Sequence, residues 1–328
     1  MSKIKKIAVL TSGGDAPGMN PCIRAVVRTA IYHKLDVVGV RQGYQGLIDD
    51  NMYDMTTRSV SNILDLGGTI LKTARCLPFR TEEGMEIAYQ NLKARGIDAL
   101  VVIGGDGTFT GALRFSKKYP DIAVMGVPGT IDNDLCGTDY TLGFDTATNT
   151  VIEALDKIRD TADAHDRLFF IEVMGRDSGC IALRAGISCG AEAILLPEKE
   201  TAISELIEGL KAGEHNKKSS SIVIVAEGDK HGGAYDVAQM VKQEVKNYDV
   251  KVTILGHLQR GGSPSAFDRI LGSRLGYACV IGLLNGDTQK MAGLKGNSVM
   301  LTSLEEALMV HEYKLEEDLM QMVEILSI

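Results

Sequence analysis

Short runs of uniformly apolar residues alternate with amphipathic stretches along most of the chain. Strands that are apolar at every position are typical of parallel sheets buried on both faces, and amphipathic stretches are typical of the helices that cover them. The apolar runs lie at 6–10, 37–40, 99–103, 122–127, 169–173, 193–197, 221–228 and 251–256. A helical pattern follows the first run at about 20–33, and another follows the third run and ends near 118. The pattern therefore predicts an α/β fold throughout.

Glycine-rich turns follow two of the predicted strands. Gly13 and Gly14 precede Asp15, and glycines let the backbone approach a phosphate at the N-terminus of the next helix. A tight strand-to-helix turn explains such a pair equally well. The second turn, IGGDGT at 103–108, places Asp106 between two glycines. Because Mg²⁺ binds through one or two carboxylates plus substrate phosphate oxygens, this Asp predicts a phosphoryl donor site, with helix capping as the alternative.

The segment PGTIDND at 128–134 carries two carboxylates, Asp132 and Asp134. In an extended segment that spacing places both on one side. One carboxylate can take a hydroxyl proton while the other orients it or a cation. Acidic turns are often structural, but this one follows a buried strand in the same fold as the GGDGT turn. We therefore interpret it as a catalytic candidate.

Further polar residues stand at the ends of later strands. The segment EVMGRDSG at 172–179 carries Arg176, and LGHLQRGG at 255–262 carries His257 and Arg260. Glu227 is the last residue of SIVIVAE at 221–227. Arginine forks match phosphate oxygens bidentately, and a carboxylate can bond a sugar hydroxyl. A solvated turn explains each residue taken alone. A solvated turn or a surface salt bridge does not explain their joint occurrence at successive strand ends.

Length and charge narrow the class of protein. A chain of 328 residues exceeds the size at which single cores stop growing, so two lobes are expected. The net charge of −8 argues against nucleic acid or a membrane surface as the main partner. No apolar run approaches the roughly 20 residues that span a bilayer, and the N-terminus lacks the pattern of a signal peptide. Six scattered cysteines without a CxxC pair indicate free thiols in a reducing cytoplasm.

Six motifs, taken in order, closely resemble the bacterial ATP-dependent 6-phosphofructokinase family. They are TSGGDAPGMN, GGTI…TARC, VVIGGDGT, PGTIDND, EVMGR and GHLQRGGSPSAFDR, and the similarity spans Lys6 to at least Arg274. The resemblance implies two doubly wound, mostly parallel lobes with the active site in the cleft between them. The ATP-binding lobe would comprise 1–142 plus about 262–307, and the fructose 6-phosphate lobe 143–261 plus about 308–328.

The resemblance also implies roles for individual residues. Asp132 would accept the proton of the sugar's 1-hydroxyl beside Thr130 and Asp134, and Arg75 and Arg176 would neutralise the transferring group. ATP binding is implied for Gly14, Arg75, Cys76, Gly105, Asp106, Gly107 and Thr108, with Asp106 holding Mg²⁺. Fructose 6-phosphate would contact Thr130, Asp132, Met174, Gly175, Arg176, Glu227, His257 and Arg260. Arg167 and Lys251 would reach the 6-phosphate from a neighbouring subunit of a homotetramer.

A second site of the family binds ADP as activator or phosphoenolpyruvate as inhibitor. Its positions match Arg24, Arg28, Arg58, Arg159, Gly190, Glu192 and Lys218. The sequence departs from the family at Thr57, where the family has an arginine, and Arg58 follows one residue later. Asn216 occupies a position that is often basic in the family. Lys251 replaces a usual arginine, which keeps the charge and loses the bidentate fork.

The donor and the competing functions follow from particular residues. Pyrophosphate-dependent relatives carry Asp at the position of Gly107 and Lys at that of Gly129, so two glycines favour ATP. A pyrophosphate-dependent enzyme is the alternative they oppose. A non-catalytic sugar-phosphate or nucleotide sensor would have no need of Asp132. A Rossmann dehydrogenase would carry GxGxxG with a downstream ribose-binding acid, and this sequence does not.

Overall fold

The computed structural model describes residues 4–163, 167–215, 221–245, 248–309 and 315–326. Lys218 and Asn216, which the sequence relates to the effector site, lie outside them. The chain divides into two compact units. Unit 1 comprises Met1–Thr146 and Arg260–Tyr313, and unit 2 comprises Ala147–Gln259 and Lys314–Ile328. The chain passes between the units after residues 146, 259 and 313.

Unit 1 contains a mixed, mostly parallel sheet with the strand order β11-β10-β5-β4-β1-β2-β3. Its strands are β1 (Lys6–Thr11), β2 (Asp36–Val40), β3 (Met52–Asp54), β4 (Ala99–Gly104), β5 (Ala123–Pro128), β10 (Lys290–Lys295) and β11 (Ser298–Ser303). The edge strand β3 pairs antiparallel with β2, and the edge strand β11 pairs antiparallel with β10. The remaining pairs of neighbouring strands are parallel.

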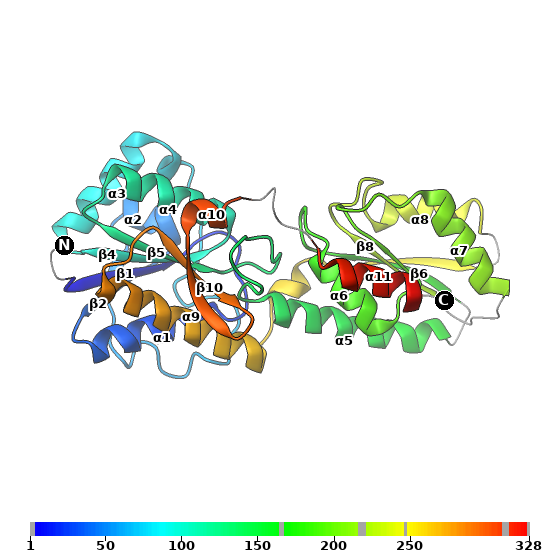
Figure 1. Ribbon diagram of the computed structural model, residues 1–328, viewed down its shortest axis with the longest axis horizontal. Coiled ribbons are helices and arrows are strands. Elements are labelled where there is room, and N and C mark those ends of the chain that lie inside the picture. The colour runs from blue at the N-terminus through cyan, green and yellow to red at the C-terminus, as the bar shows by residue number, and fades with distance from the viewer. Residues whose placement is uncertain (1–3, 164–166, 216–220, 246–247, 310–314, 327–328) are drawn as a thin grey trace. The chain divides into compact units, whose positions relative to one another are not determined.

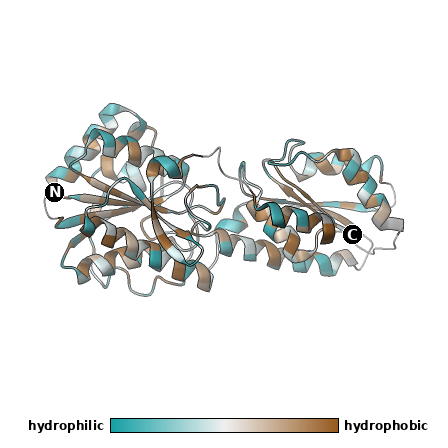
Figure 2. Ribbon diagram, in the orientation of Figure 1, coloured by the Kyte–Doolittle hydropathy of each residue, from teal (hydrophilic) through white to brown (hydrophobic). Residues whose placement is uncertain are grey.

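Helices cover both faces of this sheet (Figure 1). They are α1 (Met19–Tyr32), α2 (Gly43–Ile48), η1 (Pro78–Arg80), α3 (Glu82–Ala94), α4 (Asp106–Lys118), α9 (Ala266–Asn285) and α10 (Leu304–Ala307). α1 and α9 lie on one face, and α2, α3, α4 and α10 on the other. The strands are brown and the outer helix faces largely teal in Figure 2, which reflects burial of the sheet on both sides.

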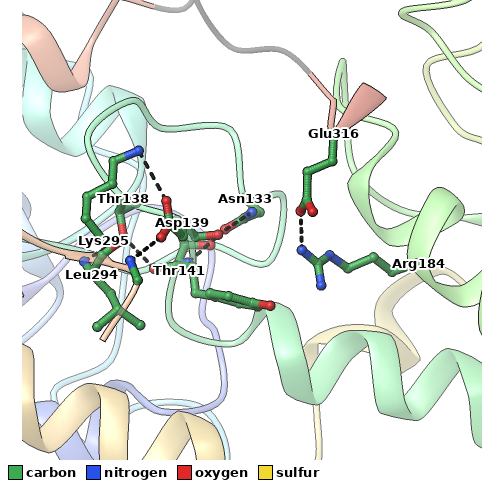
Figure 3. Close-up of polar contacts among 10 residues, drawn as sticks. Asn133, Thr138, Asp139, Thr141, Arg184, Leu294, Lys295 and Glu316 are labelled. Atoms are coloured by element: carbon green, nitrogen blue, oxygen red, sulfur yellow. Dashed lines mark hydrogen bonds and ion pairs between the residues drawn. The ribbon is translucent and has the colours of Figure 1, made fainter. Parts of the chain in front are cut away.

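Unit 2 contains a parallel sheet with the order β7-β8-β6-β9. Its elements are α5 (Phe144–Asp163), which begins in unit 1, β6 (Arg167–Val173), α6 (Cys180–Cys189), β7 (Ala193–Leu195), α7 (Ile203–His215), β8 (Ser221–Ala226), α8 (Ala234–Lys242), β9 (Asp249–Ile254), η2 (Gly256–Arg260), whose last residue belongs to unit 1, and α11 (Glu317–Leu326). Leu206 and Leu210 of α7 and Val237 of α8 pack on β6 and β8. An ion pair between Arg184 and Glu316 ties α6 to the start of α11 (Figure 3).

The α/β fold with mostly parallel sheets is confirmed. All eight predicted strands are present, with ends shifted by a few residues. Strands β3, β10 and β11 were not predicted. Within the described residues, no helix combines the length and the apolar character required to cross a bilayer.

Candidate active site

The carboxyl ends of β1, β4 and β5 meet at one edge of the unit 1 sheet. β4 pairs in parallel with β1 on one side and with β5 on the other. From β1 the chain continues to β2 in one direction across the sheet, and β4 and β5 extend the sheet in the opposite direction. Open α/β sheets bind ligands beyond the strands' carboxyl ends at such a reversal. The three Gly- and Asp-containing turns predicted from the sequence all begin at this edge.

Hydrogen bonds hold the turn after β1 against the turn after β4. The Ser12 amide donates to the Ile103 carbonyl oxygen (3.0 Å), and the Thr108 hydroxyl donates to the Ser12 carbonyl oxygen (3.1 Å). Tyr44, whose ring stacks on Phe79, donates its hydroxyl proton to the Thr108 carbonyl oxygen (2.5 Å). Thr108 is therefore fixed from two sides. The sequence suggested no role for Tyr44, because it lies 64 residues from Thr108 along the chain and the fold brings the two together.

α4 begins at Asp106, directly after Gly105. Asp106 is half-buried and Gly107 is exposed, and no heavy atom lies within 4 Å of the position a Cβ on Gly107 would take. A helix N-terminus attracts anions through its first amides and the helix dipole. A carboxylate there, beside open backbone, fits the way proteins hold Mg²⁺ together with a phosphate. The turn is thus suited to both groups.

The segment after β5 lies beside this turn. The Gly129 amide donates to the Gly104 carbonyl oxygen (3.0 Å), and the Asp132 amide donates to the Thr130 hydroxyl (3.2 Å). Thr130 and Asp132 are buried, at 8% and 3% exposure. Asp134 is half-buried. The expectation of an extended segment is wrong between the two carboxylates, because Asn133 has a left-handed φ of 53°.

The loop that carries Arg75 and Cys76 is anchored by a residue to which the sequence assigned no role. The Asn20 side chain donates to the carbonyl oxygens of Leu66 (3.0 Å) and Gly67 (3.2 Å) and accepts from the Ile70 amide (2.8 Å). Arg75 is exposed, whereas Cys76 packs against the unit 1 core, and burial raises the pKa of the Cys76 thiol.

Arg260 lies over the turn after β1. Its guanidinium donates to the Asp15 carbonyl oxygen (3.2 Å), and Nη1 lies 2.6 Å from the position a Cβ on Gly14 would take. The sequence related Arg260 to the sugar phosphate and Gly14 to ATP. In unit 1 the two residues touch.

The sugar-related residues of unit 2 gather at the carboxyl ends of β6 and β8. The Glu227 carboxylate accepts hydrogen bonds from the amides of Gly175 (3.2 Å) and Arg176 (2.7 Å). Arg176 is exposed and has a left-handed φ of 54°, which is uncommon outside glycine. Glu227 therefore fixes the backbone that presents the Arg176 guanidinium.

A buried glutamine links this turn to the segment that carries His257. The Gln259 side chain is 0% exposed. It accepts from the Met174 amide (3.2 Å) and donates to the Gly256 carbonyl oxygen (3.1 Å). His257 is exposed on η2. Gln259 belongs to the LGHLQRGG segment at 255–262, but the sequence suggested no role for it.

Arg167 and Lys251 are not brought to these residues. Both form ion pairs with the Asp249 carboxylate, whose oxygens lie 3.5 Å from Arg167 Nε and 2.9 Å from Lys251 Nζ. Arg167 begins β6, a strand of 7 residues, so about 20 Å of strand separate it from Met174. The hydrogen bond from Lys251 lowers the pKa of Asp249 against the opposing effect of desolvation.

The effector-related residues lie in both units. Arg24 and Arg28 lie one turn apart on α1, and burial, followed by repulsion from Arg28, lowers the pKa of Arg24. Arg58 is exposed in a turn. In unit 2 the Arg159 guanidinium donates to the carbonyl oxygens of Cys189 and Gly190 at the end of α6.

Glu192 completes the unit 2 group. Its carboxylate accepts from the Ile222 amide (2.8 Å), which fixes it against the start of β8. Gly190, at the C-cap of α6 with φ 62°, connects it to the Arg159 contact. Arg159, Gly190 and Glu192 therefore lie close together at the end of α6 and the start of β8.

A doubly wound sheet whose reversal point carries glycine turns, a helix N-terminus and carboxylates is typical of α/β proteins that bind nucleotides and phosphorylated metabolites. The model of one such family, described as phosphofructokinase, matches residues 6–283. This chain belongs to the phosphofructokinase family.

Individual relatives share most or all of the chain. An ATP-dependent 6-phosphofructokinase 2 of Bacteroides thetaiotaomicron is 52% identical over 328 residues, 100% of both chains. An ATP-dependent 6-phosphofructokinase of Cytophaga hutchinsonii is 52% identical over 324 residues, 99% of this chain and 98% of the relative. The structure of phosphofructokinase from Saccharomyces cerevisiae matches 98% of this chain with a TM-score of 0.89 and 37% identity. This chain covers 47%, about half, of that yeast chain.

Proposed function

We propose that this chain transfers the γ-phosphoryl group of ATP to the 1-hydroxyl of fructose 6-phosphate, giving fructose 1,6-bisphosphate and ADP, a step of glycolysis. The observation that carries the proposal is the position of the buried Thr130–Asp132 pair beside the turn that leads into α4 at Asp106. Identity of 52% over the full length of a relative named for this activity supports the same reaction.

Each half of the reaction has residues suited to it. Asp132 accepts the proton of the attacking hydroxyl, with Thr130 and Asp134 beside it. The turn Gly105–Thr108, together with Gly14, Arg75 and Cys76, binds ATP. Bound Mg²⁺, held by Asp106 and phosphate oxygens, would neutralise charge on the donor phosphates. Catalysis of this kind consists mainly of positioning and electrostatic stabilisation, which Arg75 and Arg176 extend.

Binding of the sugar phosphate is proposed for residues at the strand ends of unit 2 and for Arg260. The unit 2 residues are Met174, Gly175, Arg176, Glu227 and His257. Arg167 and Lys251 would serve the 6-phosphate of a neighbouring subunit in a homotetramer. Their position a strand length from Met174 within their own chain supports that assignment.

ATP is favoured over pyrophosphate chiefly by Gly107. The open space around it leaves room for the ATP phosphates, which an Asp side chain would crowd and repel. Gly129 is less informative than the sequence suggested. A Cβ there would lie 3.0 Å from Met19 and 3.1 Å from Ile103, so packing alone explains the glycine.

Regulation and location complete the proposal. ADP or phosphoenolpyruvate would bind at Arg24, Arg28, Arg58, Arg159, Gly190, Glu192 and Lys218. A cytoplasmic location is supported by the six cysteines, which are free thiols.

The test is a coupled assay on fructose 6-phosphate with ATP or pyrophosphate as donor, each with and without Mg²⁺. The proposal predicts fructose 1,6-bisphosphate from ATP, a strict requirement for a divalent cation, and little product from pyrophosphate. Turnover with pyrophosphate alone would overturn the donor assignment. Absence of product with either donor would overturn the function.

A further inference from the structure

Asn133 separates the two carboxylates of the proposed reacting segment. It is buried, at 6% exposure, and its φ of 53° lies in the left-handed region. Asn is one of the few residues with a side chain that enters this region at low cost, since its short amide can hydrogen-bond locally. The backbone therefore departs from the extended conformation between Asp132 and Asp134.

The Asn133 side chain closes the loop that follows it. Its Nδ2 donates to the Asp139 carbonyl oxygen (3.1 Å), and its Oδ1 accepts from the Thr141 amide (2.8 Å). The Thr141 hydroxyl in turn donates to the Thr130 carbonyl oxygen (2.6 Å). Figure 3 shows Asn133 reaching into the turn formed by Asp139 and Thr141. One side chain thus connects both ends of the reacting segment through the same loop.

The far side of this loop is fixed to the edge of the sheet. The Asp139 amide donates to the Leu294 carbonyl oxygen (2.7 Å), and the Asp139 carboxylate accepts from the Gly296 amide (2.6 Å). Lys295 lies 3.2 Å from the same carboxylate (Figure 3). The loop to which the Asn133 side chain is hydrogen-bonded is therefore attached to β10 by bonds within the protein, without a ligand.

We propose that Asn133 is a positioning residue for the transfer reaction. Its amide holds the backbone in the orientation that directs the Asp132 carboxylate at the acceptor hydroxyl. The inference rests on the proposed function. It predicts that loss of the amide disturbs the chemical step and leaves binding of both substrates nearly unchanged, because among the described residues the amide bonds to backbone groups of Asp139 and Thr141.

Asn133→Gly tests the inference, since glycine adopts the left-handed angle readily and removes only the side-chain bonds. We expect kcat to fall about tenfold to a hundredfold, because misplacing a reacting group by about 1 Å can cost about 10²-fold. The KM values for ATP and fructose 6-phosphate should stay within about threefold. Rates are normalised to the concentration of ADP-binding sites from calorimetry, so partly unfolded protein does not count as lost catalysis.

Lys295→Met is the matched control, because it removes an exposed ion pair from the far side of the same loop. Its kcat should stay within about twofold of the wild type, as exposed pairs contribute little. If Asn133→Gly does not fold, Asn133→Asp replaces it. That variant keeps an acceptor for the Thr141 amide, loses the donor to Asp139, and should show the same selective fall in kcat.

The outcomes separate the two claims. A normalised kcat equal to that of the wild type in Asn133→Gly, or in its replacement, overturns the positioning role and leaves the proposed function intact. An equal fall in Lys295→Met also overturns it, because the loop as a whole would then be responsible. A wild-type protein that does not phosphorylate fructose 6-phosphate overturns both claims.

Discussion

Two residues of the proposed site hold backbone angles that side chains rarely adopt. Asn133 has φ 53° and Arg176 has φ 54°. Asn enters this region at low cost, whereas for Arg such an angle costs about 1–3 kcal/mol and persists only where the surroundings enforce it. At Arg176 the Glu227 carboxylate enforces the angle, because it accepts a hydrogen bond from the Arg176 amide. The motifs could be predicted from the sequence, but these angles could not, because each depends on a partner that the chain's periodicity does not reveal.

Gly107→Asp should fold normally and lose ATP activity. The Cβ would enter open space, and an acidic residue in the first turn of α4 suits the helix dipole. We expect kcat/KM for ATP to fall about a hundredfold or more, since juxtaposed like charges cost several kcal/mol. Gly107→Asn, of similar size and no charge, should lose less. Full ATP activity in Gly107→Asp would refute the role of this position in donor choice.

At the scale of elements, the sequence predicted what depends on uniform burial. The central strands β1, β4, β5, β6 and β8 were predicted because nearly every position in them is apolar and buried. Burial alone does not decide the outcome, because β9 has the same burial pattern as β11 and was predicted, whereas β10 is buried at its four central positions and was not. Strand β3 has only 3 residues. Contacts such as that of Gln259 with Met174, 85 residues apart, also required the fold.

Asp268 should make the stability of the α5–α9 junction depend on pH. Its buried carboxylate on α9 accepts from the amides of Gly143 and Thr146 (2.9 Å each) and from the Thr146 hydroxyl. Burial raises the pKa of Asp268 from 3.8 to about 6, against the opposing effect of these bonds. Because the unfolded chain loses this proton first as the pH rises, the contribution is fully present below about pH 4 and is lost by about pH 6.

The comparison is with Asp268→Asn, in urea unfolding at matched pH. The free energy of unfolding of the wild type relative to the variant should fall by up to about 3 kcal/mol between pH 4 and pH 7, since one pKa unit corresponds to about 1.4 kcal/mol. A difference between the two proteins that is constant over this range would contradict the assignment.

At the scale of the whole molecule, the net charge of −8 conceals local cationic groups. Within the described residues, no carboxylate lies within ion-pair distance of Arg24 or Arg28, and the two arginines repel each other. Arg159, by contrast, already bonds two carbonyl oxygens of its own unit. Of the residues that the family resemblance assigns to the effector site, Arg24 and Arg28 are therefore better candidates than Arg159 for binding an anion, because an anion would offset their mutual repulsion.

Arg28→Ala should weaken the response to effectors while leaving the maximal rate at saturating fructose 6-phosphate nearly intact. Effectors act only through different affinities for two states, so loss of a cation that contacts the anion reduces the shift. The measurement is a fructose 6-phosphate saturation curve for both proteins with and without phosphoenolpyruvate or ADP. An unchanged shift in Arg28→Ala would place the effector site elsewhere, and no shift in the wild type would remove the regulatory proposal.

The central claim is that Asp132 takes the proton of the sugar hydroxyl as ATP transfers its γ-phosphoryl group. The most direct test is the steady-state kinetics of Asp132→Asn with ATP and fructose 6-phosphate. We predict that kcat falls by at least about 10²-fold, the contribution typical of a positioned general base, with little change in either KM. A variant that retains a near-normal kcat would contradict the account.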